Sequence, residues 1–165
     1  MSRFGVYLSI VVFLSVAPFT HADKPVDRRP NILLCMADDW SWPHSPLYGD
    51  KVVQTPTFER IAAAGILFQN AFVSAPSCTP SRNALLTGQY HWRLGPGGNL
   101  WSRFPEGPQT YPNILEDNGY YVGTYRKAFG PGRDRERPVA GKSYASPQDF
   151  FKKRPAGVPF CFWFG

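Results

Sequence analysis

Two apolar runs constrain the fold more than any other feature of this sequence. Residues 31–37 read NILLCMA, and residues 159–165 read PFCFWFG. Both runs are almost continuously apolar, which is typical of strands covered on both faces in a parallel sheet. Each run holds one cysteine, Cys35 or Cys161, and a free cysteine in such a strand usually behaves as a small buried hydrophobe. We therefore predict two buried strands and no disulfide framework.

Helix boundaries alternate with further strand-like segments between these two runs. Each predicted helix begins near a Thr or Ser followed by a proline, and most end at a glycine, as caps and first turns require. Strands that alternate with helices predict an α/β fold with a mostly parallel sheet. Three predicted helices cover residues 55–65, 110–119 and 146–155. A fourth has Pro80 in its first turn and runs toward Gly88. The further predicted strands cover residues 66–73 and 120–125.

The stretch from Arg126 to Ser146 shows little periodicity, and a loop of that length in a compact domain is usually functional. It contains GRDRERP at residues 132–138, which contributes to the formal net charge of +6. We interpret this cluster as a solvated loop and expect no nucleic-acid partner, because no nucleic-acid-binding motif accompanies it.

The chain has 165 residues, of which 43% are hydrophobic, and this suffices for the core of one domain. Its last predicted strand has no following segment to cover it. We therefore expect residues 31–165 to be the N-terminal part of a larger domain.

The first 22 residues have the layout of a secretory signal peptide. Arg3 precedes an apolar run from Val6 to Val16, and small residues end the segment at Ala22. A retained membrane anchor is the alternative, which the shortness of the run disfavours. We expect cleavage after Ala22, a polar linker over residues 23–30, a secreted or periplasmic protein and no stable membrane insertion.

Two adjacent carboxylates follow the first apolar run. Asp38 and Asp39 stand at the carboxyl end of the predicted strand, where functional groups of open α/β sheets gather. Both can approach one point only if the strand ends there, and residues 40–43 provide such a break. A hard divalent cation bound through oxygen would offset their repulsion. The alternative is that one aspartate caps a turn and the other is solvated.

The third cysteine, Cys78, lies in SCTPSR, residues 77–82, rather than in an apolar run. It stands just before a predicted helix, whose free N–H groups and dipole favour negative charge. Arg82 falls one turn into that helix and can reach back to its start. These residues describe an anion site that holds a nucleophile. A thiolate nucleophile would need a histidine base, for which His91 is the nearby candidate and His44 a second one.

CTPSR followed by NALLTG resembles the signature of the sulfatase family. RPNILLCMADD, TPTFERIAAAGILFQNAF and LEDNGYYVGTYRK resemble the segments that surround this signature, and the resemblance runs in register from about Arg29 to Gly165. The chain looks closest to the branch with heparan N-sulfatase-like and iduronate sulfatase-like members. The resemblance implies an alkaline phosphatase-like α/β fold, a three-layer sandwich around a mostly parallel sheet, which is incomplete in this chain.

The resemblance also implies a role for each candidate residue. In sulfatases a formylglycine-generating enzyme converts the motif cysteine to formylglycine (3-oxoalanine). The hydrated aldehyde attacks sulfur with one hydroxyl and expels sulfate with the other, which a thiol cannot do. By this resemblance Cys78 is the formylglycine precursor, Arg82 steadies the formylglycine and Lys127 contacts the sulfate. Asp38, Asp39 and the modified Cys78 are Ca²⁺ ligands.

The match departs from the family around Lys127. Arg126 precedes it where the family usually has glycine, and the histidine that the family has soon after the lysine is absent. Either this branch does without that histidine or the site is impaired. The family's remaining metal ligands, and a further histidine and lysine, belong to later sequence.

Three functions follow from these observations. The leading one is calcium-assisted hydrolysis of sulfate esters or N-sulfates, on a sulfated small molecule or glycan, by a formylglycine nucleophile. The second is phosphonate or phosphate monoester hydrolysis by the same fold. The third is an inactive secreted fragment that binds sulfated glycan through its basic and aromatic surface. The stretch from Arg126 to Ser146 is the candidate specificity loop.

Overall fold

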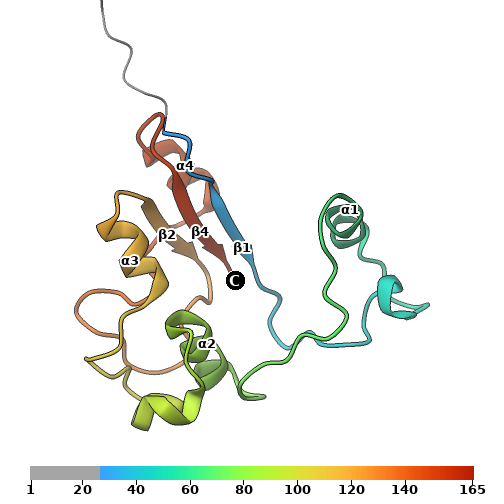
Figure 1. The fold of residues 1–165 in the computed structure, drawn as a ribbon, viewed down its shortest axis with the longest axis horizontal. Helices are drawn as coiled ribbons and strands as arrows, with labels where there is room; N and C mark the ends of the chain where they lie inside the picture. Colours follow the sequence, from blue (N-terminus) through green and yellow to red (C-terminus); the bar gives the residue numbers. More distant parts are fainter. Residues whose placement is uncertain (1–26) are drawn as a thin grey trace, which may run out of the picture.

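A four-stranded parallel sheet with the order β1-β4-β2-β3 forms the centre of the molecule (Figure 1). The structure is a computed structural model that describes residues 27–165, so the predicted signal peptide lies outside the described residues. None of the helices in this range is long and apolar enough to cross a membrane. The strands are β1 (Ile32–Cys35), β2 (Tyr121–Tyr125), β3 (Lys142–Ser143) and β4 (Phe160–Phe164).

Four α-helices and two 3₁₀ segments accompany the sheet. All four helices were predicted, because their first turns carry Pro or Ser/Thr signals that act locally. Ser146 caps α4 by accepting a hydrogen bond from the backbone N–H of Asp149 at 3.0 Å. The segments are α1 (Pro56–Ala64), α2 (Cys78–Thr87), α3 (Tyr111–Asp117), α4 (Pro147–Lys153), η1 (Pro46–Tyr48) and η2 (His91–Gly98).

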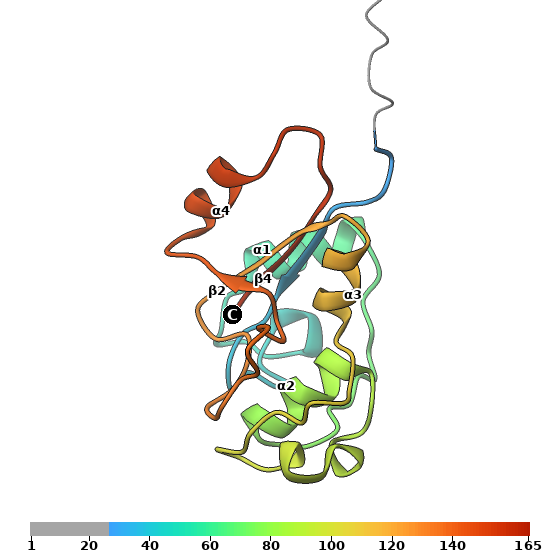
Figure 2. The ribbon, with the colours of Figure 1, turned by 90° about the vertical axis from the view of Figure 1, so that its left-hand side faces the viewer.

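The sheet lies between two helical layers, with α4 on one side and α2 and α3 on the other (Figure 2). Strand β4 is buried on both faces of the sheet. Its neighbouring residues Phe162 and Trp163 point to opposite faces, and both side chains are buried. Phe162 packs with Phe150 of α4, whereas Trp163 packs with Leu86 of α2. The predicted three-layer α/β arrangement is therefore present in this chain.

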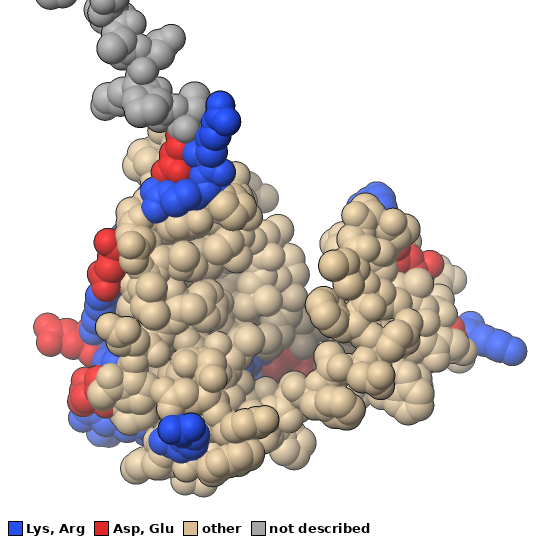
Figure 3. Space-filling view, in the orientation of Figure 1, with Lys and Arg blue, Asp and Glu red and all other residues tan. Residues whose placement is uncertain are grey.

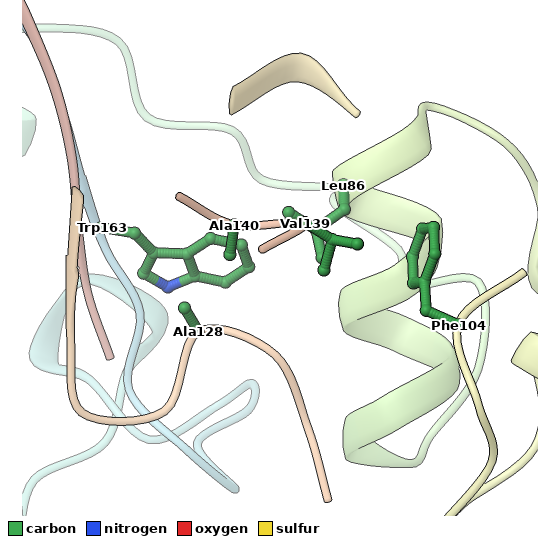
Figure 4. Packing of buried hydrophobic residues seen from close by; sticks show 6 residues of the cluster. All are labelled: Leu86, Phe104, Ala128, Val139, Ala140 and Trp163. Atoms are coloured by element: carbon green, nitrogen blue, oxygen red, sulfur yellow. The ribbon is translucent and has the colours of Figure 1, made fainter. Parts of the chain in front are cut away.

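The larger core cluster joins α2 to the sheet. In Figure 4 the indole of Trp163 lies against Ala128 and Ala140, and Val139 lies between this group and the helix that carries Leu86. Phe104 closes the far end of the cluster. Three members of the cluster come from the stretch between Arg126 and Ser146. This stretch is a loop up to β3, and it nevertheless contributes side chains to the core.

Residues 132–138 form an exposed loop, as predicted, in which only Arg135 is half-buried. Arg135 donates hydrogen bonds to the carbonyls of Glu106 and Pro108, each at 3.0 Å, and its guanidinium lies 5.0 Å from the ring centroid of Phe104. Arg137 forms ion pairs with two carboxylates of α3. These cations pair locally, and the face shown in Figure 3 carries no continuous basic stripe.

The burial of Cys35 was predicted wrongly, whereas Cys161 is buried as predicted. Strand β1 is an edge strand that pairs only with β4. Leu34 packs against the larger core cluster. Leu33 and Cys35 point to the other face, and they belong neither to that cluster nor to the smaller one, which is formed by Tyr144, Phe150 and Phe162. Leu33 is consequently 59% exposed, and Cys35 is exposed beside it.

The strand predicted at residues 66–73 is also wrong. No strand forms there, and its apolar side chains are largely exposed, from 70% for Phe68 to 92% for Phe72. A strand needs a partner for its backbone hydrogen bonds, and none of the described strands lies beside this segment. Together with α1, it stands away from the sheet on the right of Figure 1.

Candidate active site

Cys78 is the first residue of helix α2, so the helix begins slightly earlier than predicted. Ser77 occupies the cap position in an extended conformation, and the first helical hydrogen bond runs from the N–H of Ser81 to the carbonyl of Ser77. The helix ends as predicted at Gly88, which has a φ of 65°. The half-buried thiol of Cys78 therefore lies at the positive end of a ten-residue helix.

Arg82 lies one turn after Cys78, and its side chain is only 3% exposed. Its guanidinium donates hydrogen bonds to the carbonyls of Lys127 and Ala128 and to Oδ1 of Asp38, the last at 3.1 Å. The guanidinium carbon also lies 5.8 Å from the ring of Trp163. A buried cation is tolerated only when it is paired and hydrogen-bonded, and these contacts meet both conditions.

Asp38 joins the two cations of the site. Its Oδ1 accepts from Arg82, and its Oδ2 accepts from the ammonium of Lys127. The hydrogen bond from the Lys127 ammonium is the main cause that holds the pKa of Asp38 below its usual range. Burial opposes this shift, and Arg82 adds to it. The carboxylate is therefore ionised at neutral pH. Asp38 follows β1, and Lys127 follows β2. Both strands pair in parallel with β4, which lies between them, so their carboxyl ends lie at the same edge of the sheet.

Asp39 is exposed and has a φ of 55°, so it forms a left-handed turn directly after β1. Aspartate tolerates this conformation better than most residues. In Figure 3, acidic and basic atoms meet in the hollow between the sheet and the part that carries α1. Within residues 27–165, however, no three metal-ligating side chains of His, Cys, Asp or Glu come together.

The donor chemistry here suits a hard cation, although it is only part of a ligand shell. Each oxygen of Asp38 accepts one hydrogen bond and keeps a further lone pair, and Asp39 adds a second accessible carboxylate. Ca²⁺ takes six to eight oxygen ligands. Asp38 and Asp39 are therefore oxygen donors of the kind that calcium takes, and an ion bound here would need further ligands.

The sequence matches the model of the family described as Sulfatase over residues 30–157, which is most of the chain. The chain belongs to the sulfatase family. Its relatives include human iduronate 2-sulfatase, 35% identical over 130 residues that cover 78% of this chain and 23% of the relative. The N-acetylglucosamine-6-O-sulfatase of Bacteroides thetaiotaomicron is 36% identical over 107 residues, covering 65% and 19%. Human steryl-sulfatase is 34% identical over 122 residues, covering 67% and 21%.

A solved structure shares the fold of this sulfatase chain. The structure of BT4656 in complex with its substrate D-glucosamine-2-N,6-O-disulfate matches with a TM-score of 0.66 and 26% sequence identity. The match covers 82% of this chain and 34% of that protein. The alkaline phosphatase-like α/β fold predicted from the sequence is therefore confirmed. The chain spans about a fifth of the length of the curated relatives that it matches.

The residues around Lys127 show how this sulfatase accommodates its departures from the family pattern. Arg126 has a φ of 63°, a left-handed conformation that glycine adopts more easily. After Lys127, Ala128 is buried in the core and Phe129 packs edge-to-face on Phe104 with ring centroids 6.2 Å apart. Ala128 therefore lies in the interior, and the half-buried Phe129 packs against the core cluster.

The two histidines considered as bases for Cys78 are paired elsewhere. Nδ1 of His91 lies 2.8 Å from the hydroxyl of Ser74, and Nδ1 of His44 lies 3.2 Å from a carboxylate oxygen of Asp50. No hydrogen bond of the described chain joins either histidine to Cys78. The structure thus brings together Asp38, Arg82 and Lys127 beside the helix that Cys78 begins, and leaves the histidines outside this set.

Proposed function

We propose that this chain is the N-terminal part of the catalytic domain of an exported sulfatase that hydrolyses sulfate esters or N-sulfates on a sulfated carbohydrate. The observation that carries the proposal is the position of Cys78 within CTPSR, at the start of the helix α2 whose Arg82 is linked to Asp38 and to the backbone carbonyl of Lys127. Lys127 is in turn paired with Asp38. Two kinds of relative support a carbohydrate substrate. An N-acetylglucosamine-6-O-sulfatase and an iduronate 2-sulfatase are similar in sequence, and BT4656, which is similar in structure, binds a disulfated glucosamine.

The proposed nucleophile forms from Cys78 by the action of a formylglycine-generating enzyme. Its hydrated aldehyde supplies one hydroxyl for attack on sulfur and a second that releases the sulfate. Cys78 begins α2, so the free N–H groups of the first turn and the positive end of the helix dipole lie close to the reacting group. This arrangement favours the negative charge that develops on the sulfuryl oxygens.

Arg82 and Lys127 supply the fixed positive charge of the proposed site. Arg82 is buried and held by two carbonyls and Asp38, so it can stabilise developing charge with little reorganisation. Lys127 is 35% exposed, and its ammonium is accessible to a sulfate group. Asp38 holds both cations at the same edge of the sheet and stays ionised there.

In the proposed enzyme Asp38, Asp39 and an oxygen of the modified Cys78 would be ligands of Ca²⁺. The ion would supply charge to neutralise the sulfate oxygens and to orient them. The remaining ligands would come from residues beyond these three.

The test is hydrolysis by the full-length protein, co-expressed with a formylglycine-generating enzyme. We expect calcium-dependent release of sulfate from an aryl sulfate and from sulfated saccharides. Cys78→Ala should abolish it, whereas the matched control Cys35→Ala should retain it, because Cys35 is exposed on the edge strand. Preferential hydrolysis of a phosphate or phosphonate ester, or activity that survives Cys78→Ala, would contradict the proposal.

A further inference from the structure

Residues 127–131, here called the Lys127 loop, wrap around the first turn of α2. Arg82 binds the beginning of the loop through the carbonyls of Lys127 and Ala128. Thr79 binds its end, because the Thr79 hydroxyl donates a hydrogen bond to the carbonyl of Pro131 at 2.8 Å. Both ends of the loop that carries Lys127 are therefore fastened to the helix that begins with Cys78.

Backbone packing in the middle of the loop adds a third contact with Thr79. A Cβ atom at Gly130 would lie only 2.6–2.8 Å from the hydroxyl oxygen, Cα and N of Thr79. The Gly130 backbone therefore lies directly on the residue next to Cys78, at a distance that no side chain permits. Thr79 itself is fully buried, so it has no exposed surface for contact with substrate.

We propose that Thr79 is a positioning residue, whose hydroxyl holds the Lys127 loop at a fixed position relative to Cys78. The inference rests on the proposed function, in which Cys78 provides the nucleophile and Lys127 contacts the sulfate. Reacting groups must be held in a near-attack geometry, and a misplacement of about 1 Å can cost about 100-fold in rate. Without the hydroxyl, Arg82 would still hold the start of the loop, but its end would lose one fastening.

The chain offers a matched pair of substitutions. Thr79→Val keeps the branched shape and removes the hydroxyl, and the Pro131 carbonyl keeps a second donor, the N–H of Trp101 at 3.2 Å. Thr110 is the control, because it is also fully buried and also donates to a loop carbonyl, that of Val139 at 2.7 Å. It occupies the N-cap position of α3, and Thr79 lies in the first turn of α2. Thr79→Ser restores the hydroxyl.

We expect full-length Thr79→Val to lose about tenfold in kcat with KM changed less than about threefold, after correction for the formylglycine content of each sample. Thr79→Ser and Thr110→Val should both stay within about twofold of the wild-type kcat. Thr110→Val should nevertheless lower the melting temperature about as much as Thr79→Val does, because each loses one buried hydrogen bond.

A second measurement does not depend on activity. Amide hydrogen exchange in the peptide that carries Lys127 should be faster in Thr79→Val and unchanged in Thr110→Val. Unchanged exchange, or a kcat for Thr79→Val equal to that of Thr110→Val, would overturn the inference. Absence of both formylglycine and sulfate release in the wild type would instead refute the proposed function, and hydrogen exchange would still decide the role of Thr79.

Discussion

Asp38 is the residue on which the charge arrangement of the site depends. The nearly inaccessible guanidinium of Arg82 needs a counter-charge, and Asp38 provides it while also binding Lys127. These cations lower the pKa of Asp38 in the folded state. The ionised carboxylate therefore stabilises the fold fully above the usual aspartate pKa of about 3.9. This stabilisation is lost as the pH falls through the lower pKa of the folded state.

Substitution of the two aspartates separates their proposed roles. In the full-length protein we expect Asp38→Asn to lower turnover about 100-fold and to weaken calcium binding, because it loses a ligand and the charge that holds two cations. Asp39→Asn should weaken calcium binding and turnover but leave those ion pairs intact. The defect of Asp38→Asn should be constant between about pH 5 and 8, since the wild-type carboxylate is ionised throughout that range.

Calcium titration by calorimetry, together with steady-state rates across that pH range, checks both variants. If Asp39 is only a turn residue, Asp39→Asn should be silent, because asparagine also tolerates left-handed turns. An unchanged calcium affinity and rate for either variant would remove that residue from the site.

At the scale of elements, local signals predicted more than long-range ones. Helices α1 to α4 follow from prolines and caps that act within one turn, and β4 follows from its apolar run. The short β3 and the exposure of Cys35 depend on strand order, which local sequence does not specify. The apolar pattern of residues 66–73 was misleading for the same reason, since a strand also needs a neighbour.

The candidate site shows the same difference between what local sequence predicts and what depends on long-range contacts. Cys78 and Arg82 were predicted from the motif, Asp38 and Asp39 from the end of the first strand, and Lys127 only from the resemblance to sulfatases. The ion pair between Asp38 and Lys127 joins residues 89 positions apart, and it required the knowledge that β1 and β2 flank β4. The fastening of the Lys127 loop by Thr79 was not predicted, although Gly130-Pro131-Gly132 is a sequence that indicates a close backbone approach.

Strand β2 offers a test of packing between the sheet and α4. A Cβ at Gly123 would lie 2.5 Å from a ring atom of Tyr144 and 2.7 Å from one of Phe150. Both rings are buried, so we expect Gly123→Ala to destabilise the full-length protein by about 1–3 kcal/mol through overpacking. Gly107→Ala is the control, because a Cβ there meets open space. Urea unfolding measures both, and equal midpoints for the two variants would contradict this account of the packing.

At the scale of the whole molecule, the described chain contains all three layers but leaves much apolar surface uncovered. Ile66, Phe68, Phe72 and Val73 are each at least 70% exposed, and they lie in the part that stands away from the sheet. Apolar patches of this kind on an isolated soluble protein usually mark an interaction surface or an aggregation liability. The chain also spans only about a fifth of the length of its curated relatives.

We therefore expect residues 23–165, produced alone, to lack a cooperative thermal transition and to bind a hydrophobic dye. They should also fail to hydrolyse aryl sulfates, because Asp38 and Asp39 would be only two of the six to eight oxygen ligands that the proposed Ca²⁺ needs. Calorimetry, dye fluorescence and the sulfatase assay measure these properties against the full-length protein. A sharp unfolding transition together with calcium-dependent hydrolysis would show that this expectation is wrong.

The central claim, that Cys78 is the precursor of the nucleophile, can be tested by mass spectrometry of one peptide. Trypsin should release residues 61–82, which contain Cys78 as their only cysteine and end at Arg82. After co-expression with a formylglycine-generating enzyme, we predict that this peptide carries the mass of an aldehyde in place of the thiol, while Cys35 and Cys161 remain thiols. A peptide that carries only unmodified Cys78 under those conditions would contradict the account.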